Sequence, residues 1–265
     1  MDAATPHDDA VLLRREAGGV VWLTLNRPAA RNALSVGLIA ALDVALAEAA
    51  LDAAVKVVVI AGNGPAFCAG HDLREMRANP GRDAYEALFA RCAALMTRIV
   101  RLPKPVIARV HGIATAAGCQ LVASCDLAVA ADTARFATPG VNIGLFCSTP
   151  MVALTRAVGR KAAMEMLLTG ELVEAARAHE IGLINRVVPE PELDAAVQAL
   201  AAQIAAKSPL TLAIGKELFH AQAELPLDDA YNLAAEAMTR NMLARDAAEG
   251  IDAFLNKRSP VWTGT

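Results

Sequence analysis

The chain has 265 residues, of which 55% are hydrophobic and 20% are charged, and its 25 basic and 28 acidic residues give a formal net charge of −3. This composition is typical of a globular protein and excludes an intrinsically disordered one. The charge is nearly balanced, and the sequence has no dense basic run and no basic residues interleaved with aromatic ones. A nucleic-acid partner is therefore not expected.

The cysteines and the hydropathy pattern predict a cytoplasmic protein. The five cysteines are scattered and form no CxxC pair, so we expect reduced thiols and neither a disulfide framework nor a metal site. Residues 1–9 are polar and acidic, unlike an export signal. No apolar run reaches the roughly 20 residues that a membrane helix needs, so no membrane partner is expected.

Predicted strands and helices alternate through the first half of the chain. Strands are expected at 11–16, 20–26, 55–61, 106–110 and 127–131, and helices at 35–51, 83–101 and 115–124. The Gly18-Gly19 pair predicts a hairpin turn between the first two strands, and Ser35 is placed to cap the first helix. This alternation predicts an α/β fold.

The second half of the chain is predominantly helical. Helices are predicted at 151–158, 160–168, 174–180, 192–207, 209–220, 227–244 and 246–256. No low-complexity linker and no fixed-period repeat divides the chain. We therefore predict a single domain over residues 1–265, with a core at about 11–190 and a helical region at about 191–265.

The start of one predicted helix is the most informative segment. An apolar run at 106–110 leads into small residues at 112–118 and ends at Gln120. The first backbone N–H groups of a helix have no partner within the helix and can stabilise a developing negative charge. Gln120 is an amide, which cannot act as a general acid or base near neutral pH. The segment predicts an anion-stabilising site without an obvious acid or base, or else an ordinary turn that packs a helix against a strand.

Five segments resemble, in order, the enoyl-CoA hydratase/isomerase family, also called the crotonase superfamily. They are Asn26-Arg27-Pro28 with Arg31-Asn32-Ala33-Leu34; Ala66-Phe67-Cys68-Ala69-Gly70-His71-Asp72-Leu73; Lys104-Pro105-Val106-Ile107-Ala108 leading through Gly118-Cys119-Gln120-Leu121 to Cys125-Asp126; Arg135-Phe136-Ala137-Thr138-Pro139 with Gly144; and Leu154-Thr155-Arg156-Ala157-Val158-Gly159. The resemblance covers about residues 11–258. Within the family, residues 138–150 resemble the branch called enoyl-CoA hydratase domain-containing protein 3.

The resemblance implies a fold, a ligand and an assembly. It implies a crotonase-like ββα spiral core, whose C-terminal helices pack copies of the chain into a homotrimer or a dimer of trimers. It implies an acyl-CoA thioester as the ligand, with coenzyme A as part of the substrate and no separate cofactor. The matching positions place the N–H groups of an oxyanion hole at His71 and Ala117. Gly70 would let the backbone approach the ligand, and Gly118 would allow a tight entry into the helix.

The chain departs from the family at the catalytic carboxylates. Hydratases of this family hold and activate one water with two glutamates, and the matching positions here are Gln120 and Gly140. Gln120 could orient a water but could not deprotonate it, and Gly140 has no side chain. Because each general acid or base typically contributes about 10²–10⁴-fold, we expect most hydration by the usual route to be lost.

Two residues are considered as substitutes for the missing carboxylates. Ser148 or Thr149 is expected to cap a helix whose first residue is Pro150. Cys147 would then lie beside a helix N-terminus, where a thiolate is favoured, so it is either a nucleophile or acid or a small buried thiol that lines the pocket. The imidazole of His71 could be catalytic, or it could face Asp72 or solvent. Four further polar residues are interpreted as structural: Asp72, His111, Asp126 and Asn142.

The phosphates of coenzyme A favour arginine and lysine. The candidates are Arg27, Arg31, Lys257 and Arg258, the last two from a neighbouring copy, although each could be an ordinary surface charge. Ala33, Ala69 and Leu73 are expected to form walls of the pocket. The sequence contains neither GxGxxG nor GxxxxGK[ST], so it does not support a nucleotide site of those kinds.

Two functions remain open from the sequence. One is an enzyme of this family, lyase-like or isomerase-like, that stabilises a thioester enolate and uses a proton-transfer group not yet identified. The other is a non-catalytic protein that binds acyl-CoA as a sensor or regulator.

Overall fold

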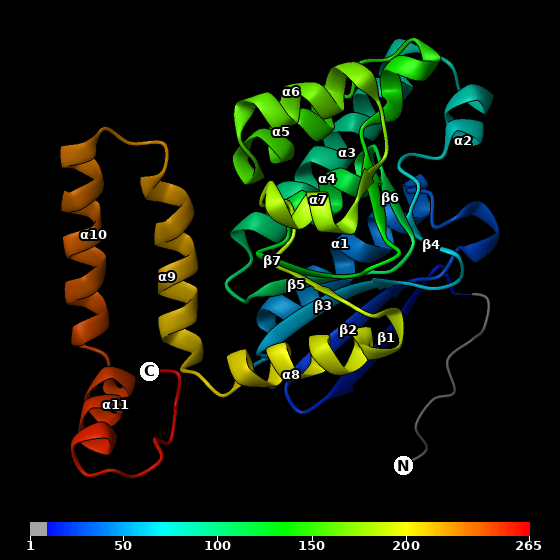
Figure 1. Cartoon of the computed structure of the whole chain (residues 1–265). Helices are drawn as coiled ribbons and strands as arrows, with labels where there is room; N and C mark the ends of the chain where they lie inside the picture. Colours follow the sequence, from blue (N-terminus) through cyan, green and yellow to red (C-terminus); the bar gives the residue numbers. More distant parts are fainter. Residues whose placement is uncertain (1–9) are drawn as a thin grey trace.

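Two sheets form the core of the structure, which is a computed structural model that describes residues 10–265 (Figure 1). The larger sheet has six strands in the order β1-β2-β3-β5-β7-β10, and the smaller has four in the order β4-β6-β8-β9. The strands are β1 (Leu12–Ala17), β2 (Val20–Leu25), β3 (Val57–Gly62), β4 (Ala66–Cys68), β5 (Val106–Val110), β6 (Ile113–Thr115), β7 (Leu127–Ala131), β8 (Arg135–Ala137), β9 (Val173–Glu174) and β10 (Arg186–Val188).

The chain adds one strand to each sheet in turn. It passes from β3 to β4, from β5 to β6 and from β7 to β8, so that β4, β6 and β8 are parallel neighbours in the smaller sheet. The segments that follow these three strands therefore emerge at the same edge of that sheet. This winding is the predicted α/β spiral, and it brings together three segments that are far apart in the sequence.

Helices cover both faces of the larger sheet (Figure 1). The helices of residues 10–265 are α1 (Val36–Leu51), α2 (Leu73–Ala78), α3 (Arg82–Arg101), α4 (Ala117–Ser124), α5 (Ser148–Ala157), α6 (Arg160–Thr169), α7 (Ala175–Glu180), α8 (Leu193–Ala205), α9 (Pro209–Gln222), α10 (Leu227–Met242) and α11 (Arg245–Leu255), with short 3-10 helices η1 (Pro28–Ala30), η2 (Pro139–Ile143) and η3 (Glu190–Glu192). Of these, α9, α10 and α11 stand apart from the two sheets (Figure 1). Successive residues of β3 alternate between the faces: Val58 and Ile60 join the cluster that contains α1 and α3, whereas Val57 and Val59 pack with α8.

A lysine with a buried side chain connects α9 to the core through hydrogen bonds and an ion pair. Lys216 on α9 donates hydrogen bonds to the carbonyls of Ile99 and Lys104, at 2.9 and 3.1 Å, and to Asp126 at 2.6 Å. The same carboxylate oxygen of Asp126 accepts a bond from Val106 N at 2.7 Å. Asp126 therefore has a structural role, as its position in the sequence suggests, and its main partner is on a distant helix.

Several predicted boundaries are wrong for local reasons. The helix expected at 115–124 begins at Ala117 because Ile113–Thr115 form β6. The helix expected at 151–158 begins at Ser148 with Cys147 as its N-cap residue. The three-residue strands β4, β6 and β8 are too short to show an alternating pattern. The interpretation of residues 1–9 lies outside the described residues.

Candidate functional site

Two backbone turns meet where β4 and β6 end. A Cβ atom on Gly70, whose φ is +92°, would lie 2.9 Å from Ala116 Cβ and 3.3 Å from Ala117 N. A Cβ atom on Gly118 would lie only 2.1 Å from the carbonyl oxygen of Cys68. The contacts of 2.9 Å and 2.1 Å are too short for a Cβ atom, so glycine at these positions is what lets the two turns touch.

These turns present two unpaired backbone donors. Within residues 10–265, neither His71 N–H nor Ala117 N–H donates a hydrogen bond, although their neighbours do: Asp72 N bonds to Leu34 O at 3.2 Å and Ala116 N bonds to Ala137 O at 2.9 Å. Ala117 is fully buried. Buried N–H groups are nearly always paired, so the Ala117 donor is available for a ligand acceptor, and the donor of the half-buried His71 lies on the turn that touches it. Ala117 is also the first residue of α4, where the helix dipole favours negative charge.

The turn before α4 is strained. Ala116 has φ 50° and ψ −118°, a conformation that glycine adopts easily and that alanine rarely adopts. Holding a residue in such a region costs of order 1–3 kcal/mol and is common at binding and catalytic sites. The strain fixes the direction of the neighbouring Ala117 N–H.

Three buried side-chain atoms beside these turns also lack partners. Among the described residues, the buried side-chain nitrogen and oxygen atoms without a hydrogen bond are His71 Nε2, Gln120 Oε1 and Thr138 Oγ1. Gln120 is 4% exposed and Thr138 is 0% exposed. Sequence reasoning missed Thr138. No sequence signal could have found it, because its position beside the turn depends on the pairing of β8 with β6.

The imidazole of His71 packs against α3, and within residues 10–265 no hydrogen bond or ion pair joins it to Asp72. Its ring contacts Phe89 edge-on, with centroids 5.5 Å apart, and burial lowers its pKa, which favours the neutral form. Asp72 caps α2 through the N–H groups of Arg74 and Glu75. Asp72 also pairs with Arg27 at 2.9 Å, and this hydrogen bond lowers the pKa of the carboxyl group.

The structure leaves no room for a side chain at Gly140. A Cβ atom there would lie 2.6 Å from Leu145 O and 2.9 Å from Cys147 Sγ. Cys147 is 7% exposed, and burial raises the pKa of its thiol. The expected thiolate is therefore disfavoured, because desolvation outweighs the proximity of the helix start. This geometry favours the alternative in which Cys147 lines the site as a neutral thiol.

The basic candidates for phosphate binding differ in availability. Arg27 is engaged by Asp72 and by the carbonyl of Ala33, which argues against its predicted role as a phosphate ligand. Arg258 bonds twice to Glu249, at 2.6 and 2.7 Å. Arg31 and Lys257 are exposed, but α11, which precedes Lys257, lies at the far end of the molecule from α2 (Figure 1).

The remaining candidates occupy the surroundings of the turns. Ala33 is buried, Ala69 is half-buried, and Leu73 is 49% exposed at the start of α2. His111 is held by Arg109 at 2.8 Å and by the carbonyl of Gly64 at 2.7 Å. Asn142 is exposed in η2. None of these five residues adds an ionisable group to the two turns.

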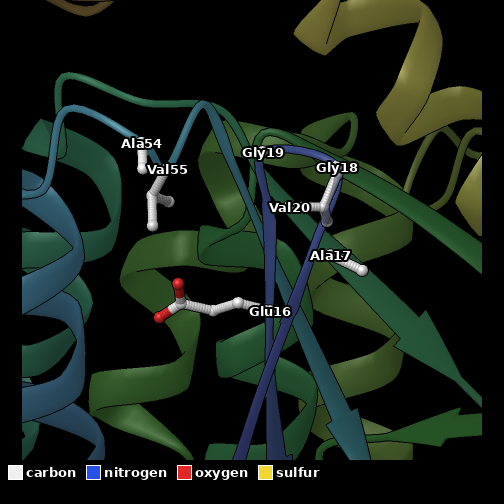
Figure 2. A pocket seen from close by; sticks show the side chains of 7 residues that line it. All are labelled: Glu16, Ala17, Gly18, Gly19, Val20, Ala54 and Val55. Carbon is white, nitrogen blue, oxygen red and sulfur yellow. The ribbon is translucent and has the colours of Figure 1, made fainter. Parts of the chain in front are cut away.

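Two cavities lie elsewhere. One of about 210 Å³ is at the turn between β1 and β2, and Figure 2 shows that Glu16 is its single charged lining residue. The other, of about 460 Å³, lies among α9, α10 and α11 and is mainly apolar. Neither is lined by a candidate residue, so unpaired polar groups, and not cavity volume, identify the site.

The described residues contain no cluster of three or more histidine, cysteine, aspartate or glutamate side chains that could hold a metal ion. All five cysteines are free thiols. Within residues 10–265, no helix is both long and apolar enough to cross a bilayer.

Comparison with known sequences now identifies the family. The sequence model of the enoyl-CoA hydratase/isomerase family matches residues 15–265. The chain belongs to this family. A relative from Xenopus laevis, named enoyl-CoA hydratase domain-containing protein 3, mitochondrial, is 48% identical over 257 residues, which are 97% of this chain and 87% of that protein.

Solved structures of this family are similar to this chain in both sequence and fold. An enoyl-CoA hydratase from Mycobacterium smegmatis is 57% identical with a TM-score of 0.94, and the match covers 96% of this chain and 99% of that chain. Human enoyl-CoA hydratase domain-containing protein 3 is 47% identical with a TM-score of 0.93, covering 96% and 100%. The predicted family and fold are confirmed. The Xenopus laevis relative is named as mitochondrial, so a cytoplasmic location stays a prediction.

Proposed function

We propose that this protein binds an acyl-CoA thioester and stabilises the enolate of that thioester with the N–H groups of His71 and Ala117. The observation that carries the proposal is the pair of unpaired backbone donors on two touching turns. A thioester carbonyl becomes an oxyanion when a proton leaves its α-carbon, and preorganised donors stabilise that charge. Removing one such donor typically costs ~2.7–4 kcal/mol of transition-state stabilisation.

Ordinary hydration is not part of the proposed function. Gln120 and Gly140 stand at the positions of the two glutamates, and neither can transfer a proton. The neutral imidazole of His71 is the titratable group nearest to the donors along the chain. It is a candidate for proton transfer, although its Nε2 is buried. A non-catalytic acyl-CoA sensor or regulator is the second candidate, favoured by the absence of a carboxylate at either position.

Calorimetry and hydrogen exchange separate these candidates. Titration with CoA thioesters of several chain lengths should show binding, and mass spectrometry should show exchange of the α-hydrogens of a bound saturated thioester in D₂O if enolisation occurs. Binding without exchange would favour the sensor. Absence of binding by every thioester would refute both. Hydration of crotonyl-CoA within tenfold of a two-glutamate relative would refute the loss of hydration.

We further propose that the chain assembles as a homotrimer or a dimer of trimers through its C-terminal helices. Support comes from large apolar side chains that are at least 67% exposed on and around α9, α10 and α11: Phe219, Leu227, Tyr231, Leu243, Phe254, Leu255 and Val261. Such a concentration of exposed apolar residues is typical of an interaction surface. Assembly would also allow Lys257 of one copy to approach the coenzyme A bound near Arg31 of another. Light scattering after size-exclusion chromatography tests this, and a monomer at micromolar concentration would contradict it.

A further inference from the structure

Thr138 and Gln120 each have a buried oxygen atom without a hydrogen-bond partner, and both residues lie in segments at the same edge of the smaller sheet. Thr138 directly follows β8, and the carbonyl of the preceding Ala137 accepts a hydrogen bond of 2.9 Å from Ala116 N. Gln120 lies on the first turn of α4, and helical side chains lean toward the N-terminus of their helix. Both side chains therefore belong to the segments that surround the Ala116–Ala117 turn, where one of the unpaired N–H groups is located.

The chemistry of the two atoms defines the missing partner. The Oε1 atom of Gln120 only accepts hydrogen bonds, so its partner must be a donor, whereas the Oγ1 atom of Thr138 can both donate and accept. Each residue is at least 96% buried, and the atoms have no partner in the described part of the chain. An anion would be repelled by the amide oxygen, and a desolvated ammonium ion would need a countercharge. A neutral O–H group satisfies both atoms.

We propose that Thr138 is a ligand-binding residue and that, with Gln120, it binds an O–H group beside the thioester. This inference rests on the proposed function. The O–H group is carried either by the acyl chain, as a hydroxyl on carbon 2 or carbon 3, or by a water molecule enclosed in the complex. Carbons 2 and 3 are the relevant positions because Gln120 is only three residues from Ala117 along α4. In either case Thr138 determines which acyl groups the site prefers.

The decisive experiment compares butyryl-CoA with 2-hydroxybutyryl-CoA and 3-hydroxybutyryl-CoA by calorimetry. The proteins are the wild type, Thr138→Val, which removes the hydroxyl at nearly constant volume, and Thr138→Ser, which retains it. Thr133→Val is the matched control, because Thr133 is exposed and its hydroxyl bonds to Glu190. We expect a hydroxy thioester to bind the wild type about 3- to 10-fold more tightly than butyryl-CoA, the contribution of one hydrogen bond.

The pattern across the variants identifies the source of the O–H group. If a hydroxy thioester binds more tightly than butyryl-CoA, and this difference in affinity is lost in Thr138→Val and kept in Thr138→Ser, the O–H group belongs to the acyl chain. Equal binding of all three thioesters, weakened about 3- to 10-fold in Thr138→Val alone, assigns it to water. Unchanged binding in Thr138→Val overturns the inference while leaving the proposed function intact. If none of the thioesters binds the wild type, the proposed function itself fails.

Thermal unfolding of the ligand-free variants excludes a merely structural role. Thr138→Val deletes a buried hydroxyl that has no partner, so its melting temperature should equal or exceed that of the wild type. A marked fall in the melting temperature of Thr138→Val, but not of Thr138→Ser, would mean that the hydroxyl has a partner within the free protein, and it would overturn the inference.

Discussion

Replacing Gly140 with glutamate tests whether the second carboxylate can be restored. The Cβ atom that any such side chain requires would lie 2.6 Å from Leu145 O and 2.9 Å from Cys147 Sγ. The first contact is with backbone, so the 145–147 segment must move before even an alanine fits. Overpacking of this kind costs about 1–3 kcal/mol. We expect Gly140→Ala to lose that much stability, Gly140→Glu to lose at least as much, and neither to gain hydration of crotonyl-CoA.

A double variant separates the two contacts. Gly140→Glu with Cys147→Ala removes the sulfur but leaves Leu145 O in place, so we expect the double variant to remain destabilised and inactive. Gly159→Ala is the control, because a Cβ atom at Gly159 has no neighbour within 4 Å. Urea unfolding measures stability, and loss of the enoyl-thioester absorbance measures hydration. Wild-type stability in Gly140→Glu, or hydration that reaches a tenth of a two-glutamate relative's rate, would refute the steric reasoning.

Three further changes test the turns, the C-terminal anchor and the buried imidazole. Gly118→Ala should destabilise the protein by about 3 kcal/mol or more and weaken thioester binding in calorimetry, because its Cβ atom would lie 2.1 Å from a backbone oxygen. Lys216→Met should cost ~3 kcal/mol in urea unfolding because it leaves the carboxylate of Asp126 without its cation. Burial lowers the pKa of His71, so the unfolded chain binds a proton at about pH 6.5 that the folded chain does not yet bind. The stability that this provides is present above pH 6.5 and is lost as the pH falls toward the lowered pKa, and His71→Gln should reduce that loss in melting curves at pH 7.5 and pH 5.

Each of these changes has a control. Gly215→Ala, on α9 with open space around the new Cβ atom, should raise stability by up to ~1 kcal/mol, and equal effects at Gly118 and Gly215 would contradict the role of close contact. Adding Asp126→Asn to Lys216→Met should recover part of the loss, because the buried charge is removed. His111 is half-buried and desolvation also lowers its pKa, so His71→Gln should remove only part of the acid sensitivity. An unchanged pH dependence would mean that burial does not control the His71 pKa.

The long apolar elements could be predicted from the sequence, whereas the short ones could not. The runs at 20–26, 55–61, 106–110 and 127–131 correspond to β2, β3, β5 and β7, because fully buried parallel strands are continuous apolar segments. The strands β4, β6 and β8 have three residues each, and their existence depends on pairing between distant parts of the chain. Since these strands determine which segments share an edge, the sequence alone could not place Thr138 at the same edge as Gln120.

The family resemblance indicates the two glycines of the candidate site, whereas features of the site that depend on distant contacts could not be predicted. Gly70 and Gly118 follow from the need for close backbone approach, and the structure gives the distances that require it. The lack of space for a side chain at position 140 is caused by the carbonyl of Leu145, five residues away. Cys147 favours the neutral thiol because it is buried. Neither can be read from residue types, which is why the sequence left open a thiolate at Cys147 that desolvation disfavours.

The polar groups that lack partners gather at one edge of the smaller sheet, together with one of the four non-glycine residues of positive φ in the described chain. The strained φ of Ala116, the unpaired N–H groups of His71 and Ala117, and the orphaned oxygens of Gln120 and Thr138 all lie in segments that follow β4, β6 or β8. Each is unfavourable for folding, since strained backbone and buried unpaired polar groups both cost free energy. Independent defects would be spread over the chain. Their concentration around one turn is what a binding site requires, because a ligand that supplies a carbonyl oxygen and an O–H group would relieve the unpaired groups together.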